Sequence, residues 1–556
     1  MRAPRRPLVL PTRCHLGERA VAGDWPDAGI RLTERSQREW SASLRLTLRA
    51  VGTVAPMTDT PGQPESLWLA KTPPPAREPF ASADKADVIV IGGGIVGATT
   101  ALELASAGAD VILLEARRVA GGVTGHSTAK VSALHETQYT QITTRVSAEA
   151  AKAYAALNSE GVAMVAELAY EHSIECSFET APNYIFSQEA EGAEKVEAEA
   201  QAAKAAGLEV ELTGETDLPF DVLAAARLSG QLAFDSAAFT RGVVSAAEAA
   251  GAVIHEHSRV MSVKHGSPCA IRLESGKELR ADRVVLATHM PLLDRGLFFA
   301  RLRPQASYAV SAPASDAPLG MYLGIGSSTR SIRSAPRADG SRSVIVGGEG
   351  HKVGQGEGGD AYPILATWLG ERFDAGAVEH RWSAHDLMSP DELPFIGPLA
   401  PFAGRVRVAT GFSKWGLAAG VAAARMLGRE LSGGTDPRQE TFDPTRLNLR
   451  ASAPDLIKEN ADVGARFFSG RLRRHKSTEL ASGEGRVVAE GLRQVAECRD
   501  ESGEVHRVSA RCTHLGCIVR WNKGDATWDC PCHGSRFAPD GAVLNGPAAV
   551  PLEPSG

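Results

Sequence analysis

Two short segments near the end of the chain concentrate side chains that bind metals. Cys512-Thr513-His514-Leu515-Gly516-Cys517 comes first, and Cys530-Pro531-Cys532-His533-Gly534-Ser535 begins thirteen residues after Cys517. Thiolate and imidazole groups bind zinc, and they also bind the iron of iron–sulfur clusters. The ligand types alone would allow a zinc site with two cysteines and two histidines. Zinc does not call for a second cysteine in each segment, which favours an iron–sulfur centre.

The two segments resemble the cluster-binding loops of the Rieske fold in cytochrome bc complexes. The resemblance implies a [2Fe–2S] cluster with one iron held by Cys512 and Cys530, the other by His514 and His533, and a disulfide between Cys517 and Cys532. Two neutral imidazoles in place of thiolates raise the reduction potential of such a cluster to about −150 to +300 mV. A disulfide is unusual in a reducing cytosol. The bridge is therefore either buried and resistant, or the two cysteines remain thiols.

A second candidate site lies where a buried strand pattern, Val88–Ile91, runs into Gly92-Gly93-Gly94-Ile95-Val96-Gly97. In a dinucleotide-binding turn Gly92 would permit the tight bend, Gly94 the approach of a pyrophosphate, and Gly97 close packing of helix on strand. The phosphates would then meet the free N–H groups at the start of a helix. Glu115 ends the next strand, at the distance expected for a carboxylate that binds the ribose.

The segments around this turn resemble the D-amino-acid oxidase superfamily, which favours FAD over NAD. Gly121–Thr128, with Thr124 and Gly125, resembles the second flavin-contacting loop, and Trp382–Gly397 resembles the stretch before the C-terminal one. The resemblance places the adenine beside Val260. It assigns the C-terminal flavin loop to Ala409–Gly416, with Gly411, Phe412, Trp415 and Gly416, where a helix start faces the electron-rich edge of the flavin.

The resemblance covers roughly residues 84–435. The chain is most similar to the glycine-oxidase-like and γ-glutamylputrescine-oxidase-like branch that carries an appended Rieske domain. In the family an arginine binds the substrate carboxylate, which makes Arg333 and Arg337 candidates here. Tyr308, Lys414 and Trp415 are further candidates for the substrate pocket, on the resemblance alone. No catalytic base is predicted, and His126, His135 and His289 are interpreted as packing or solvent-facing residues.

The elements that must position these sites follow from hydrophobic periodicity. Helical patterns at 142–207 flank a short strand at 184–186, and a helix at 237–250 leads into a strand at 252–262. Further strands are expected at 283–287, 307–310, 344–347 and 406–409, the last one followed by a helix at 416–431. The predicted fold is an α/β FAD-binding Rossmann-like domain with an interleaved β-rich substrate domain, plus a C-terminal all-β Rieske domain.

The predicted domain boundaries follow these patterns. The FAD-binding segments are 84–150, 230–295 and 380–435, and the substrate-domain segments are 151–229 and 296–379. A linker at 436–475, with Gly-Gly, Asp-Pro turns and a basic run, precedes the Rieske domain at 476–556.

Residues 1–83 are interpreted as an N-terminal extension that is either disordered or the result of a wrongly assigned gene start. The first 56 residues are rich in arginine and lack the apolar core of a signal peptide, so Met57 is the favoured start. A twin-arginine export signal at Arg5-Arg6 is the alternative. Residues 57–84 are rich in proline and predict an extended lead-in.

The whole composition bounds the function. With 556 residues and a net charge of −6, the chain predicts several domains and gives no general attraction to nucleic acid or anionic membranes. No stretch predicts a transmembrane helix, and we expect a cytoplasmic protein.

The functional hypothesis is an FAD-dependent oxidoreductase that removes a hydride from a C–N bond of a small amine or amino acid. Electrons would then pass to the Rieske cluster and on to a soluble carrier. Reverse electron flow, from carrier through cluster to flavin, is one alternative. A non-catalytic redox sensor is the other.

Overall fold

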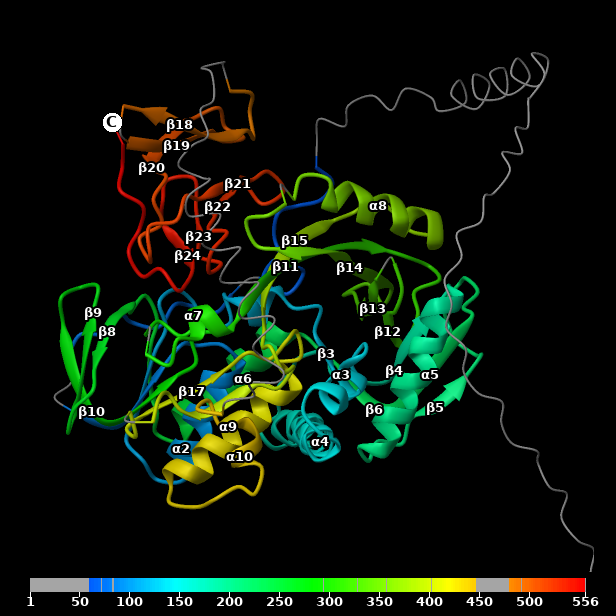
Figure 1. Cartoon of the computed structure of the whole chain (residues 1–556), viewed down its shortest axis with the longest axis horizontal. Coiled ribbons are helices and arrows are strands. Elements are labelled where there is room, and N and C mark those ends of the chain that lie inside the picture. Colours follow the sequence, from blue (N-terminus) through cyan, green and yellow to red (C-terminus); the bar gives the residue numbers. More distant parts are fainter. Residues whose placement is uncertain are drawn as a thin grey trace, which may run out of the picture. The chain divides into compact units, whose positions relative to one another are not determined.

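The structure is a computed structural model that describes residues 60–446 and 480–555, except residues 72, 83, 84, 294, 328, 357, 402 and 492. The predictions for residues 1–59, and for the linker beyond residue 446, lie outside the described residues. All of the described residues belong to one compact unit (Figure 1).

The dinucleotide turn is built into a largely parallel sheet. Its order is β16-β17-β10-β1-β2-β7, and a hairpin of β8 and β9 is attached to β10. The strands are β1 (Ala86–Ile91), β2 (Val111–Leu114), β7 (Val253–His255), β8 (Val260–Lys264), β9 (Cys269–Leu273), β10 (Glu278–Leu286), β16 (Phe395–Pro398) and β17 (Val406–Thr410). Strands β7, β2, β1, β10 and β17 run parallel to one another. Strand β2 is buried along its whole length, as expected where both faces of a parallel sheet are covered.

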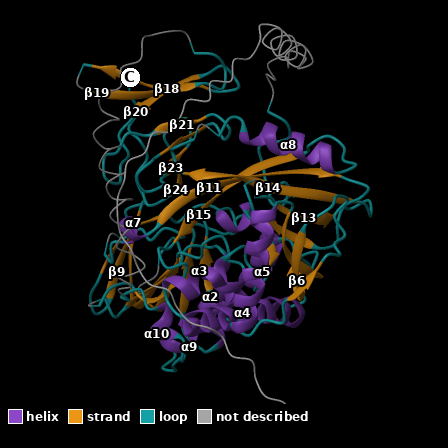
Figure 2. Cartoon of the chain, turned by 45° about the vertical axis from the view of Figure 1, so that its right-hand side comes forward, coloured by secondary structure: helices purple, strands orange, loops and turns teal. Residues whose placement is uncertain are grey.

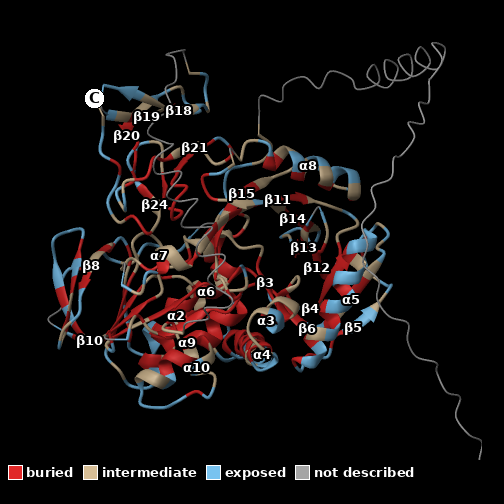
Figure 3. Cartoon of the chain, in the orientation of Figure 1, coloured by how far each residue is buried: buried red, intermediate tan, exposed pale blue. Residues whose placement is uncertain are grey.

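Helices form the layer beside this sheet (Figure 2). Helix α2 packs against α6 and α9, and α9 packs against α4. Their bounds are α2 (Ile95–Ser106), α4 (Ala148–Glu171), α6 (Ser236–Ala249) and α9 (Ala418–Leu431). Alanine and glycine on α9 allow a close approach, since Gly428 lies against Glu103 and Gly420 against Val96. This layer is among the most buried parts of the chain (Figure 3).

A second, mostly antiparallel sheet has the order β15-β11-β14-β13-β12-β4-β6-β3, with β5 paired to β6. Its strands are β3 (Lys130–Val131), β4 (Glu179–Ser187), β5 (Glu211–Thr213), β6 (Ala224–Ala233), β11 (Arg303–Pro313), β12 (Met321–Gly324), β13 (Ser331–Pro336), β14 (Arg342–Lys352) and β15 (His380–Met388). The helices in these segments are α3 (Gln138–Arg145), α5 (Ala190–Ala205), α7 (Phe298–Arg301) and α8 (Ala361–Arg372), and α10 (Gln439–Phe442) follows α9. The two sheets thus alternate along the chain, which confirms the predicted interleaving of a Rossmann-like and a β-rich part.

The C-terminal region consists of two small antiparallel sheets. One contains β18 (Gly485–Glu490), β19 (Arg493–Arg499) and β20 (Val505–Ser509), and the other contains β21 (Arg520–Asn522), β22 (Thr527–Asp529), β23 (Arg536–Phe537) and β24 (Val543–Asn545). Trp528 and Phe537 lie in a separate hydrophobic core here, together with the cysteines of both metal-binding segments. The predicted all-β C-terminal domain is confirmed.

The sequence predicts one strand over residues 252–262, and the structure divides it. Strand β7 ends at His255 and pairs with β2, whereas β8 begins at Val260 and pairs with β9. Between them His257 takes a positive φ of 49°, which breaks the extended backbone. The break carries Val260 from the parallel sheet into the hairpin.

The proline-rich lead-in packs on the body where it is described. Trp68 is buried and donates from its indole to the Ser127 carbonyl over 2.7 Å. Lys71 forms an ion pair of 2.6 Å with Asp235, and Phe80 is buried. This part of the predicted N-terminal extension therefore contributes to the folded body.

Among the described residues, no helix combines the length and apolar character needed to cross a membrane.

Candidate functional site

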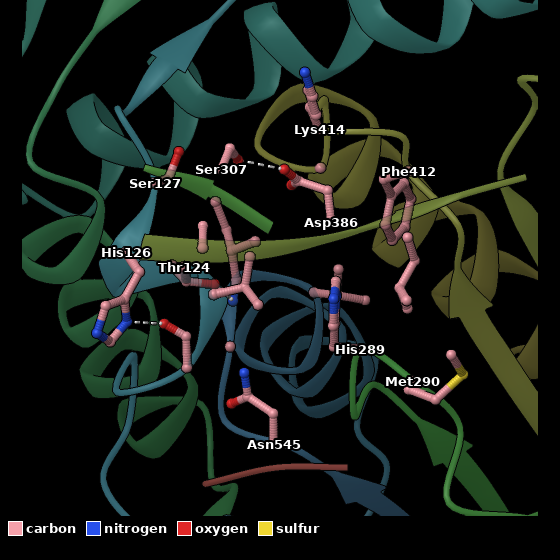
Figure 4. Close-up of a pocket in the computed structure, with 18 of the residues that line it drawn as sticks. Thr124, His126, Ser127, His289, Met290, Ser307, Asp386, Phe412, Lys414 and Asn545 are labelled. Atoms are coloured by element: carbon pink, nitrogen blue, oxygen red, sulfur yellow. Dashed lines mark hydrogen bonds between the residues drawn. The ribbon is translucent and has the colours of Figure 1, made fainter. Parts of the chain in front are cut away.

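A cavity of about 530 Å³ joins the two large sheets and the C-terminal region. It receives residues from the β1–α2 turn, the η1 turn (Val123–His126), β11, β15 and the segment after β17. Figure 4 shows Thr124, Phe412, His289 and Asp386 around this cavity. Most of the residues predicted to bind FAD line it: Gly92, Gly94, Glu115, Thr124, Val260, Phe412, Trp415 and Gly416.

The β1–α2 turn has the shape that a pyrophosphate requires. Gly92 has φ +109°, and a Cβ there would lie 2.5 Å from the Ala287 carbonyl oxygen. A Cβ on Gly97 would lie 1.9 Å from the Gly92 oxygen, so only glycine lets α2 pack this closely. Gly94 is the N-cap of α2 and brings no side chain to cap the helix, whose start faces the cavity. The turn fits an anionic cofactor group bound by backbone N–H donors.

Glu115 stands at the mouth of this turn. Its carboxylate accepts hydrogen bonds from the backbone N–H groups of Gly93, at 2.7 Å, and Arg117, at 2.8 Å. These two bonds fix the carboxylate beside the turn, and the side chain lines the cavity. The position fits the predicted ribose contact, which stays a prediction.

The two predicted flavin loops face each other across the cavity. The Thr124 hydroxyl accepts a hydrogen bond of 3.1 Å from the Ile95 N–H and so joins the η1 turn to α2. Phe412 and Trp415 follow β17, after Gly411 turns the chain with φ +72°. Gly97, Gly125 and Gly411 are not among the lining residues, so their place is in shaping the turns.

Three charged side chains at the substrate-domain end of the cavity were not predicted from the sequence. Lys130, Glu136 and Asp386 line the cavity together with the predicted Lys414. Burial lowers the pKa of Lys130 to about 7, and the charge of Arg333 acts in the same direction. Burial raises the pKa of Asp386, against the opposing charge of Lys414. The charge of Glu136 raises the pKa of Lys414, and their side chains form an ion pair of 3.7 Å.

Arg259, Arg330 and Lys414 of the cavity each pair with a carboxylate, whereas Lys130 pairs with none in the part of the chain that the structure describes. Lys130 is buried, and its amine donates to the Ser331 hydroxyl. Among the described residues, no carboxylate lies within ion-pair distance of it. Arg330 also lines the cavity, but Glu349 neutralises it at 2.8 Å. The lysine stands in a strand of two residues, and no motif marked it in the sequence.

The structure places neither candidate arginine among the residues that line the cavity. Arg333 is buried outside the lining residues, where it donates to the Ser334 carbonyl over 2.9 Å and lies over the Trp68 ring. Arg337 is not a lining residue either, and it pairs with Glu379 at the surface. Their role in binding a substrate stays a prediction. Sequence alone could not separate them from Arg330, because only the packing of β13 decides which arginine meets the cavity.

Tyr308 lines the cavity as predicted, but its hydroxyl serves another contact. It accepts a hydrogen bond of 3.1 Å from the Asn522 amide in the C-terminal region. Tyr362 donates a hydrogen bond of 2.6 Å to Asp525, also across the interface between the flavoprotein body and the C-terminal region. Burial raises the pKa of Tyr308 far above its ordinary value, so the phenol stays protonated.

Arg536 is the centre of this interface. Its guanidinium forms ion pairs of 2.9 Å with both Asp525 and Asp529, and it donates to the Ser383 hydroxyl over 2.8 Å. Burial alone would raise the pKa of Asp529, but the charge of Arg536 acts with further charges and hydrogen bonds to hold that pKa below its ordinary value. Ser383 of β15 thus helps to stabilise the buried charges of the C-terminal region through its hydrogen bond with Arg536.

The two metal-binding segments lie together in the structure. Cys517 and Cys532 form a disulfide with a Cα–Cα distance of 6.5 Å. Cys512 and Cys530 are buried free cysteines, and the ring centroids of His514 and His533 are 5.0 Å apart. The sulfur atoms of Cys517, Cys530 and Cys532 lie close together, as metal ligands would. Cys517 and Cys532 are bonded to each other, however, so they offer no thiolates to a metal. Two thiols and two imidazoles remain, which fits a Rieske cluster and leaves the individual ligands as predictions.

The histidine side of this centre faces the flavoprotein body. The Phe299 ring meets both histidine rings edge-on, at 5.8 Å from His514 and 5.2 Å from His533. A Cβ on Gly534 would lie 2.6 Å from Pro304. His385 is buried beside Gly534. Burial is the largest influence on the pKa of His385 and lowers it, whereas a hydrogen bond to the Gly534 backbone acts to raise it.

Sequence profiles agree with the two sites. The profile described as FAD dependent oxidoreductase (DAO) matches residues 87–430, and the Rieske [2Fe-2S] domain profile matches residues 472–554. The chain therefore belongs to the DAO family of FAD-dependent oxidoreductases and carries a Rieske domain that binds a [2Fe–2S] cluster.

Its relatives include proteins with one or both parts. YhfW of Bacillus subtilis, whose name calls it a Rieske 2Fe-2S iron-sulfur protein, is 32% identical over 495 residues, which cover 88% of this chain and 97% of YhfW. The cytochrome b6-f complex iron-sulfur subunit 3 of Nostoc sp. is 62% identical over 42 residues, 8% of this chain and 24% of that subunit.

Two solved structures share the fold of the body. Glycine oxidase from Geobacillus kaustophilus superposes with a TM-score of 0.55 at 17% identity, over 66% of this chain and 100% of that one. L-proline dehydrogenase from P. horikoshii gives 0.54 at 18% identity, over 66% and 98%.

Proposed function

We propose that this protein oxidises a C–N bond of a small amine or amino acid and passes the electrons through its Rieske domain to an external carrier. One observation carries the proposal. The cavity beside the predicted FAD-binding turn also contains the charged side chains at its substrate-domain end. Residues 544–549 of the Rieske domain form part of its lining. The flavin and the domain that holds the cluster would therefore meet at one cavity.

Bound FAD supplies the acceptor for a hydride from the substrate carbon. The residues of the chain would hold the substrate for that transfer. We propose that Lys130 binds a substrate carboxylate, because it is the buried cation of this cavity with no acidic partner among the described residues. Asp386, held by the Ser307 hydroxyl at 2.9 Å, would accept from the substrate nitrogen. Phe412 and Trp415 would exclude water from the reacting carbon.

The test is anaerobic mixing of the purified protein with a panel of amines and amino acids. A substrate should bleach the flavin absorbance, and the cluster absorbance should then fall as electrons move on. Bleaching by no member of the panel would leave the sensor as the better hypothesis. Oxidation of the prereduced cluster by a substrate that accepts electrons would favour reverse flow.

Lys130 should give the reaction a pH dependence. Its pKa near 7 in the free protein means that the ammonium form is lost as pH rises through about 7. At low concentrations of a carboxylate substrate, the rate of flavin reduction should fall across that range. At saturation the fall should move to higher pH, because a bound carboxylate favours the charged amine.

The matched variants are Lys130→Met and Lys152→Met, the second at an exposed position of α4. Lys130→Met should lose the step near pH 7 and weaken substrate binding about tenfold or more, the loss expected for a charge-assisted hydrogen bond. Lys152→Met should keep the wild-type profile. A step near pH 7 that survives in Lys130→Met would assign it to another group.

His533→Cys tests the direction of electron flow. An anionic thiolate in place of imidazole should lower the cluster potential, which makes transfer from flavin to cluster unfavourable. Steady-state turnover with a one-electron acceptor should then fall, while the first reduction of flavin by substrate keeps its rate. Two-wavelength stopped-flow measures both steps. Unchanged turnover would place the cluster off the catalytic path.

A further inference from the structure

The Rieske domain reaches into the cofactor cavity with one continuous segment. Residues 544–549 line the cavity and run from the end of β24 into the segment that follows it. The lining residues of the flavoprotein body include Gly92, Gly94 and Glu115, where the FAD pyrophosphate and ribose are expected. The segment is therefore part of the wall around the predicted cofactor.

Contacts on both sides hold this segment in place. Val543 pairs with Phe537 in the small sheet, and the Ala548 N–H donates to the buried Ser535 hydroxyl over 3.0 Å. From the body, the Arg259 guanidinium donates to the Val543 carbonyl over 3.3 Å. Arg259 also lines the cavity, directly before Val260, where the adenine is expected. The wall is thus fixed to the Rieske core and to the FAD-binding body.

Asn545 is the polar side chain of this wall. Figure 4 shows it extending from the C-terminal strand toward the residues around the cavity. An amide offers two donors and an acceptor. Among the described residues, the side-chain amide of Asn545 has no hydrogen-bond partner. An amide that lies in a cofactor cavity and has no hydrogen-bond partner in the protein can form a hydrogen bond with the cofactor.

We propose that the Rieske domain is a working part of the FAD site, with the Asn545 amide hydrogen-bonded to the bound FAD and residues 544–549 closing the cavity over it. Cofactor binding and docking of the Rieske domain then stabilise each other, because coupling between two binding events is reciprocal. A loss of FAD would loosen the Rieske domain, and a loosened Rieske domain would release FAD. This inference concerns how the cofactor is held and does not depend on the substrate.

The first measurement is FAD affinity in full-length protein, with the flavin removed and titrated back by fluorescence. Asn545→Ala should weaken FAD binding about five- to tenfold, the loss expected for one hydrogen bond. Arg493→Ala, at an exposed position of β19, should bind FAD as the wild type does. Iron content and the cluster spectrum should stay unchanged in both variants. No substrate enters these readouts, so they stand apart from the proposed oxidation.

The second measurement is hydrogen exchange of the backbone in residues 544–549, with and without FAD. Added FAD should slow exchange there in the wild type, and less so in Asn545→Ala. A further variant, Ala549→Phe, places a ring at a half-buried position of the same wall. It should weaken FAD binding more than Asn545→Ala does, with the cluster retained.

Three results would overturn the proposal. Wild-type FAD affinity in both Asn545→Ala and Ala549→Phe would show that the wall does not touch the cofactor. Exchange in residues 544–549 that ignores FAD would show that the domains are not coupled. Loss of iron in parallel with loss of FAD in both variants would assign the effect to a damaged Rieske domain.

Discussion

Gly94→Val should abolish FAD binding and leave the Rieske centre intact. In the folded chain the atom nearest to a Cβ at this position is the Thr124 hydroxyl, at 3.2 Å, so the Thr124 side chain must shift by a few tenths of an ångström. The branched side chain would also occupy the place of the pyrophosphate beside the start of α2. The purified variant should lack the flavin absorbance, and its iron content should equal that of the wild type.

Glu115→Ala is the comparison for this variant. It removes the expected ribose hydrogen bonds but leaves the phosphate turn in place, so FAD binding should weaken by about 1–3 kcal/mol rather than disappear. Titration of the flavin-free proteins measures both effects. Equal losses in the two variants would mean that Glu115 mainly supports the turn, through its bond to the Gly93 N–H. A shared loss of iron would indicate a collapsed fold.

Arg536→Met should be the most destabilising single change at the interface between the Rieske domain and the body. It leaves Asp529 fully buried without its guanidinium, and Asp525 loses its ion pair of 2.9 Å. Removing one partner of a buried ion pair costs about 3–5 kcal/mol. Denaturant unfolding, followed at the flavin and the cluster wavelengths, measures this loss.

The charge argument has its own controls. Adding Asp529→Asn to Arg536→Met should recover part of the stability, because one unpaired buried charge is removed. Arg493→Ala, on the exposed side of β19, should change stability by no more than about 0.5 kcal/mol. A loss of under about 1 kcal/mol in Arg536→Met would show that solvent reaches these carboxylates once the arginine is gone.

The sequence determined the two cofactor classes because each depends on residues close together in the chain. The turn from Gly92 to Gly97 works through backbone conformation and needs only the adjoining strand and helix. The cysteines and histidines of the two C-terminal segments are likewise set by short spacings within a hairpin-rich domain. Periodicity also predicted the alternation of α/β and β-rich segments, since helices and antiparallel strands bury one face whereas strands inside a parallel sheet bury both. It missed the break at His257, where a positive φ ends one strand before the next begins.

Only the tertiary structure decided which side chains meet around the cofactor. Lys130, Asp386 and Asn545 come from three strands far apart in the chain, and no local pattern relates them. Arg333 and Arg337 were plausible by position, yet Arg333 in β13 is buried over the Trp68 ring, and Arg337 just after β13 pairs with Glu379. Placing the Rieske histidines against Phe299 required the docking of two domains. Long-range contacts such as these depend on the summed packing of whole sheets, which a linear spacing does not encode.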